Sequence, residues 1–116
     1  MATHNQLGAK GELMAANYLR SKNYRILESN WRWQKAEVDI IAQSNNILVF
    51  IEVKTRSSAT FIKPEEAVHE KKQQLLIAAA EAYCEAKQLD LEIRFDVIAI
   101  VHQGNKTSIK QIEGAF

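Results

Sequence analysis

The stretch EVDIIAQSNNILVFIEVKTR, residues 37–56, contains the pattern that decides the fold. Residues 37–42 predict a short strand. Residues 47–55 form a nearly continuous apolar run, which is typical of a central strand covered on both faces. Between them, Ser44-Asn45-Asn46 predicts the turn of a hairpin. We therefore expect these two strands to pair antiparallel inside a sheet.

On either side of this hairpin, helical and strand patterns alternate. The apolar spacing predicts a helix from about Leu7 to Ser21, followed by a strand over residues 24–33. A second helix is expected from Pro64, which suits a first helical turn, to about Lys87. Its predicted apolar face consists of Val68, Leu75, Ala79, Ala82, Tyr83 and Ala86. Residues 93–101 predict a buried strand and residues 107–112 an edge strand. The order αβββαβ, with one extra strand, indicates an α/β fold whose central mixed sheet is flanked by helices.

Composition sets the broad class of the protein. The 116 residues suffice for one domain over residues 1–116, and the single cysteine, Cys84, excludes an internal disulfide and a multi-cysteine zinc site. The three histidines lack zinc-like spacing. No apolar run has the length of a transmembrane helix, and the first residues lack a signal-peptide core, so we expect a cytoplasmic protein without a membrane partner. Net charge is +1, but residues 1–72 hold 11 Lys/Arg against 8 Asp/Glu, so a polyanion would bind the first part.

Three residues of the hairpin carry the chemistry. Side chains alternate along a strand, so Glu52 and Lys54 point to the same side. Asp39 lies across the hairpin and can approach Glu52. Two neighbouring carboxylates repel each other, and Mg²⁺, which prefers oxygen ligands, relieves that repulsion. Lys54 would then act on a scissile phosphate or on the attacking water. The alternative is a plain salt bridge of Lys54 with Glu52 or Asp39 at a solvated strand end.

Two charged residues outside the hairpin add to this pattern. On a helical wheel, Glu12 flanks the apolar face of the first helix, so its carboxylate faces the edge of the sheet. Lys72 lies among apolar positions of the second helix. Its stem covers apolar surface while the amine reaches either open water or the acidic site. The sequence leaves both alternatives open.

These residues together resemble a known family. The motifs are GAKGE (residues 8–12), EVDIIA (37–42), FIEVKTR (50–56), PEEAV (64–68), Lys72 and RFDV (94–97). In order and spacing they are similar to the YraN-type family of small bacterial proteins. That family is placed in the PD-(D/E)XK, restriction-endonuclease-like superfamily, near Holliday-junction resolvases. The chain departs from the family at Val38, where the superfamily has proline, and at Asn23, Ala36 and Ile62, where glycine is usual.

The resemblance implies a restriction-endonuclease-like fold and a site. Asp39 stands for the motif's Asp and Glu52-Val53-Lys54 for its (D/E)XK, with the main-chain carbonyl of Val53 completing the metal shell. Glu12 resembles the extra carboxylate that resolvase-like members carry on their first helix. The implied activity is phosphodiester hydrolysis on DNA with Mg²⁺ or Mn²⁺, by a resolvase-like endonuclease that can be a homodimer.

Further residues are expected to contact the substrate. We expect Lys72, Arg56 and Thr55 to meet phosphates. The alternative is a nuclease-like fold kept as a non-catalytic nucleic-acid or protein-binding module. Trp31-Arg32-Trp33 suits either the inward face of a strand or a single-strand binder. Asp96 is expected to pair with Arg94 or with a main-chain donor.

Overall fold

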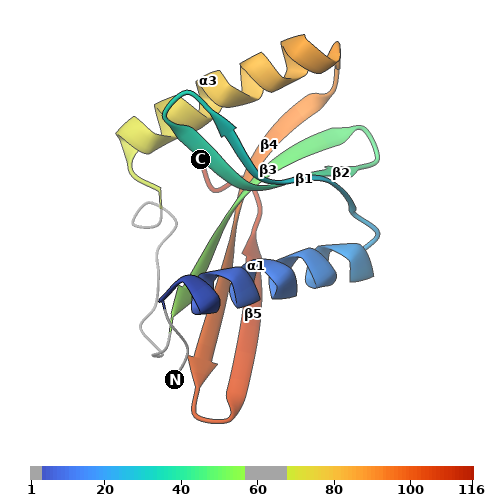
Figure 1. Ribbon diagram of the computed structural model, residues 1–116. Coiled ribbons are helices and arrows are strands. Elements are labelled where there is room, and N and C mark those ends of the chain that lie inside the picture. The colour runs from blue at the N-terminus through green and yellow to red at the C-terminus, as the bar shows by residue number, and fades with distance from the viewer. Residues whose placement is uncertain (1–3, 57–67) are drawn as a thin grey trace.

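The computed structural model describes residues 4–56 and 68–116, which form an α/β structure (Figure 1). Its elements in chain order are α1 (His4–Ser21), β1 (Arg25–Trp33), β2 (Ala36–Ser44), β3 (Ile47–Arg56), α3 (Glu70–Lys87), β4 (Glu92–Gln103) and β5 (Lys106–Ile112). The predicted αβββαβ order with an extra edge strand is confirmed. Among the described residues, no helix has the length and apolarity needed to cross a membrane.

The five strands form one mixed sheet in the order β1-β2-β3-β4-β5. β1, β2 and β3 pair antiparallel as a meander, and β5 pairs antiparallel with β4. Only β3 and β4 are parallel, because the connection through α3 returns the chain to the same end of the sheet. The sheet therefore has the mixed arrangement of a restriction-endonuclease-like core, with the predicted hairpin strand β3 at its centre.

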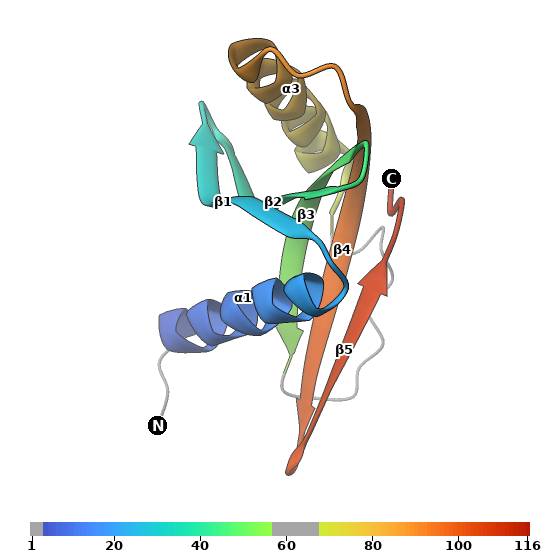
Figure 2. The ribbon, with the colours of Figure 1, turned by 90° about the vertical axis from the view of Figure 1, so that its right-hand side faces the viewer.

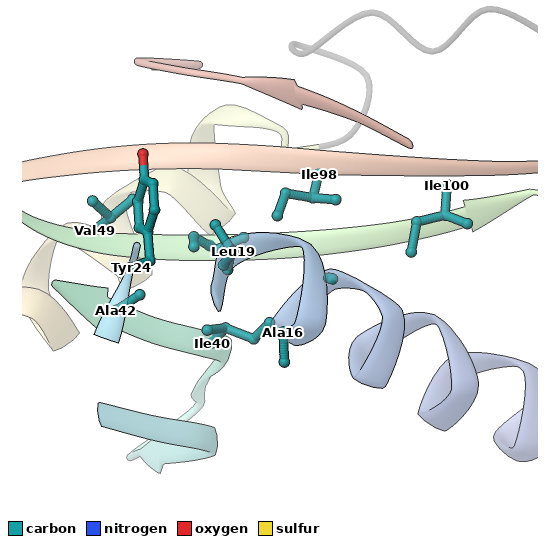
Figure 3. Close-up of a cluster of buried hydrophobic side chains, with 10 residues drawn as sticks. Ala16, Leu19, Tyr24, Ile40, Ala42, Val49, Ile98 and Ile100 are labelled. Atoms are coloured by element: carbon teal, nitrogen blue, oxygen red, sulfur yellow. The ribbon is translucent and has the colours of Figure 1, made fainter. Parts of the chain in front are cut away.

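Each face of the sheet carries one helix (Figures 1 and 2). α1 covers a cluster that includes Leu19, Tyr24, Ile40, Val49 and Ile98, drawn in Figure 3. α3 covers a second cluster on the opposite face of the sheet. Successive residues of β3 contribute alternately to the two clusters. On one side, Val49 and Ile51 face α1. On the other side, Leu48 and Phe50 face α3. This alternation explains why residues 47–55 read as continuously apolar.

The β2–β3 hairpin has the predicted turn, and its two strands separate before they end. Asn45 has a φ of 54°, and the turn joins the pair Ser44 and Ile47. The last paired residues are Ile40 and Ile51. Beyond them β3 continues beside β4, whereas the first part of β2 follows β1 toward α3 (Figure 2). Asn30 lies in β1 opposite Asp39, because its neighbours Ser29 and Trp31 pair with Ile40 and Val38. Its φ of 53° bends β1 at that point.

The backbone describes two of the three positions where glycine is usual in the family. Asn23 has a φ of 67°, a left-handed conformation that asparagine tolerates. Ala36 begins β2, and the left-handed residue of the β1–β2 turn is Gln34. Ile62 lies outside the described residues.

The predicted second helix is confirmed over Glu70–Lys87, with Ala79 and Tyr83 buried as predicted, but it does not run without a break through His69. Pro64 lies outside the described residues, and α3 begins at Glu70, because His69 is extended and caps the helix with its side chain. The buried face is Leu76, Ala79, Ala80 and Tyr83. Two predicted members, Ala82 and Ala86, are half-buried and exposed, respectively.

Candidate active site

Asp39 is held at the point where β2 and β3 separate. It immediately precedes Ile40, the first residue of β2 that pairs with β3, and its Oδ2 accepts a hydrogen bond of 2.8 Å from the main-chain N–H of Val53. The carboxylate thus takes the place that a main-chain acceptor has in a continuing ladder. Because the N–H and C=O of one strand residue point to the same edge, the Val53 carbonyl is directed toward the same gap.

Glu52 is the buried charge next to this gap, with 8% of its surface exposed. Its Oε1 is 2.5 Å from Nζ of Lys72 and 3.4 Å from Nζ of Lys54. A salt bridge between Lys54 and Glu52 is therefore present, but its carboxylate is buried and is shared with Lys72. The amine of Lys72 turns to the acidic site and not only to water, which decides between the two alternatives for its position.

The crowding of carboxylates changes the acidity of Asp39. Desolvation by burial and the neighbouring charge of Glu52 raise the pKa of Asp39 from 3.8 to about 7. Glu12 raises it further, whereas the Val53 N–H and Lys72 act in the opposite direction. The carboxylates of Asp39, Glu52 and Glu12 and the ammonium group of Lys72 are therefore close enough to interact.

Glu12 is positioned by the close packing of α1 on β3. A Cβ on the preceding residue, Gly11, would lie 2.1 Å from Oγ1 of Thr55, so only glycine allows this approach. The half-buried Glu12 thereby comes beside the gap. Thr55 packs on α1 and not beside Glu52 and Lys54, because it occupies the other side of β3. Arg56 is exposed at the end of the strand.

A cleft of about 380 Å³ opens next to the two carboxylates. It lies between the start of β2 and the first turns of α3. The residues around it are Lys35, Ala36, Glu37, Asp39, Glu52, His69, Lys71, Lys72, Leu75 and Leu76. Sequence reasoning missed Lys35, His69 and Lys71. The pair Lys71-Lys72 near a helix start was the available indication, but it does not tell which way either side chain points.

The oxygen groups at the gap fit a hard divalent cation. Two neighbouring carboxylates and a main-chain carbonyl are ligands that Mg²⁺ and Mn²⁺ accept, with water or phosphate filling the remaining positions. Among residues 4–56 and 68–116, no three His, Cys, Asp or Glu side chains are close enough to form a metal cluster by themselves. The residues that would hold the ion are thus Asp39 and Glu52, with the carbonyl of Val53.

The sequence as a whole is similar to one family of bacterial proteins. The model of the uncharacterised protein family UPF0102 matches residues 11–100, which include every charged residue of the gap. The chain belongs to this family. A UPF0102 protein of Christiangramia forsetii is 52% identical over all of this chain and 98% of its own length. A UPF0102 protein of Flavobacterium psychrophilum is 51% identical over all of this chain and 98% of its own length. A relative in Alkaliphilus oremlandii is 42% identical over 97% of this chain and 99% of its own. Membership confirms the resemblance to the YraN-type family.

Three other residues considered in the sequence, Trp31, Cys84 and Asp96, make contacts within the fold of this UPF0102 protein. Trp31 packs edge-on against Tyr83, with ring centroids 5.1 Å apart, which supports the inward face of a strand. Burial raises the pKa of the Cys84 thiol, as expected for a structural cysteine. Asp96 pairs with Arg94 through both carboxylate oxygens, as predicted.

Proposed function

We propose that the protein is a metal-dependent phosphodiester hydrolase, a resolvase-like endonuclease that acts on DNA in the cytoplasm with Mg²⁺ or Mn²⁺. The observation that carries this proposal is the pair Asp39 and Glu52, held together where the sheet divides. Burial and mutual repulsion raise the pKa of Asp39 to about 7. A fold gains nothing from a half-buried and a buried carboxylate that repel each other, so the placement of Asp39 and Glu52 favours a role in ligand binding.

Each residue of the gap has a defined task in this proposal. Asp39, Glu52 and the Val53 carbonyl hold the ion, which when bound supplies a more acidic water and neutralises charge on the phosphate. Lys54 positions the attacking water or stabilises the charge that develops on the phosphate. Glu12 assists as a third carboxylate beside Asp39.

The cations around the cleft would bind the nucleic-acid backbone. Lys35 comes from the β1–β2 turn, and Lys71 and Lys72 come from α3, so the cleft is basic on two sides. Nδ1 of His69 accepts from the main-chain N–H of Lys72, which leaves Nε2 as the donor of the neutral ring. Arg56 extends this surface at the end of β3. The side chain of Thr55 takes no part, because it packs against Gly11.

A second candidate is a non-catalytic DNA-binding module on the same fold. The favouring observation is that two ammonium groups already lie on Oε1 of Glu52, which balances its charge without a metal ion. Such a module would bind DNA through the same cleft. Its affinity would not depend on a divalent cation.

Cleavage of a panel of labelled branched, single-stranded and duplex DNAs, with Mn²⁺ and with chelator, tests the proposal. We expect metal-dependent cutting that Asp39→Asn and Glu52→Gln each reduce at least about 100-fold, because a near-isosteric change removes the ligand charge. Glu37→Gln is the matched control, because Glu37 lines the same cleft but is not a proposed metal ligand. Its Oε2 instead lies 3.4 Å from Nη2 of Arg32.

The outcomes separate the candidates. Cutting that survives in both Asp39→Asn and Glu52→Gln would come from another protein in the preparation. Binding without cutting of any substrate, at equal affinity with Mn²⁺ and chelator, would establish the non-catalytic module.

A further inference from the structure

Lys72 contacts the residue that the metal ion needs. Its Nζ lies 2.5 Å from Oε1 of Glu52, closer than Lys54 at 3.4 Å. Lys72 also acts on the second carboxylate, since its charge opposes the increase in the pKa of Asp39. In the metal-free protein, one ammonium group therefore balances part of the charge of both proposed metal ligands.

A divalent ion and this ammonium group compete for the same oxygen atoms. Two cations on one carboxylate repel each other strongly when the site is partly buried, because the surrounding medium screens them weakly. An ion that binds Glu52 therefore favours departure of Lys72. Lys54, at a longer distance and on the same strand as Glu52, has less reason to move.

The side chain of Lys72 has a second place to go. Its main chain is anchored in the first turn of α3, where its N–H bonds to His69. Its stem has four rotatable bonds and the side chain is 32% exposed. Lys72 also borders the cleft that Lys35 and Lys71 make basic. A phosphate bound there offers the ammonium group a new anion when it leaves Glu52.

We propose that Lys72 is a tethered cation that occupies Glu52 in the metal-free protein and moves to a substrate phosphate when a divalent ion binds. Metal and DNA then bind with positive coupling. A bound metal ion displaces Lys72 from Glu52 and makes its ammonium group available to DNA, and bound DNA draws Lys72 away from Glu52 and makes that carboxylate available to the metal ion. By linkage, DNA raises metal affinity by the same factor as metal raises DNA affinity. This inference rests on the metal site of the proposed function.

Calorimetric titration with Mn²⁺ at pH 8 tests it, without DNA and with a phosphorothioate oligonucleotide that keeps the phosphate charge. We expect Lys72→Gln to bind Mn²⁺ roughly tenfold more tightly than wild type without DNA, a factor within the usual range of coupling. In wild type the oligonucleotide should raise Mn²⁺ affinity by a similar factor. In Lys72→Gln that increase should be largely lost.

Lys71→Gln is the matched control, because Lys71 precedes Lys72 in α3, borders the same cleft and is exposed. A change in Mn²⁺ affinity common to both variants is the general effect of one less positive charge. Only the excess in Lys72→Gln reports the contact with Glu52. Circular dichroism establishes that both variants are folded, and the wild-type coupling is measurable even if Lys72→Gln is not.

Three results would overturn the inference. Equal or weaker Mn²⁺ binding by Lys72→Gln than by Lys71→Gln would mean that Lys72 organises the site and does not compete. Wild-type Mn²⁺ affinity unchanged by the oligonucleotide would remove the coupling, while DNA cutting could still stand. No Mn²⁺ binding by wild type in either condition would remove both this inference and the metal site of the proposed function.

Discussion

Two groups of buried carboxylates in this protein are satisfied in opposite ways. Asp96 is 1% exposed and receives four hydrogen bonds from Arg94, Gln111 and Gly114. Asp39 receives one, from Val53, and lies against the charge of Glu52. Rigid donors hold the Asp96 group and join β4, β5 and the end of the chain. The Asp39–Glu52 group depends on flexible lysines, so its charge remains available to a ligand. The comparison separates a structural carboxylate from one suited to binding.

The largest expected effect on stability is at Asp96. Asp96→Asn should lower the free energy of unfolding by about 3 kcal/mol, because it removes the buried charge partner of Arg94 and leaves that residue only its ion pair with the exposed Glu113. Asp39→Asn should lower the free energy of unfolding far less, because the amide oxygen of asparagine can accept the same hydrogen bond from the Val53 N–H. Urea unfolding of both variants in chelator measures the difference. Equal losses would mean that the two groups are alike.

The next effect sharpens the comparison with metal. At a Mn²⁺ concentration a hundredfold above its dissociation constant, wild type should gain about 2.7 kcal/mol of stability. For a domain of this size, that gain raises the melting temperature by several degrees. Asp39→Asn should gain almost nothing, while Asp96→Asn should gain as much as wild type. Melting curves with Mn²⁺ and with chelator provide the test. A response that Asp39→Asn retains would place the ion elsewhere.

The smallest effect is a dependence of stability on pH. The pKa of Asp39 is about 7 in the folded protein and 3.8 as its ordinary value, so between these values the folded state binds more protons than the unfolded state. In chelator, its contribution is therefore fully present below pH 4 and is lost as pH rises through 7. We expect wild type to lose about 2 kcal/mol relative to Asp39→Asn between pH 5 and pH 8. Parallel pH profiles would show that Asp39 is not perturbed.

Much of the fold follows from local patterns. The two strands of the hairpin, its Asn45-Asn46 turn and the αβββαβ order were predicted, because strand and helix periods and turn residues are local properties. The start of α3 was wrong, since His69 interrupts a sequence that reads as helical from Pro64. The capping role of His69 depends on its extended backbone.

The sequence by itself predicted that Asp39 approaches Glu52 across one hairpin with Lys54 on the same side as Glu52, because side chains alternate along a strand. It also predicted that Asp96 pairs with Arg94 or with a main-chain donor, and the structure shows both. Only the tertiary structure decided that the amine of Lys72 lies on Glu52 and that Lys35 and Lys71 share a cleft with the carboxylates. The raised pKa of Asp39 is likewise a property of the folded structure. These features depend on the bend of β1 and β2 and on where the crossover places α3. Packing sets those positions over long range, and no local pattern encodes them.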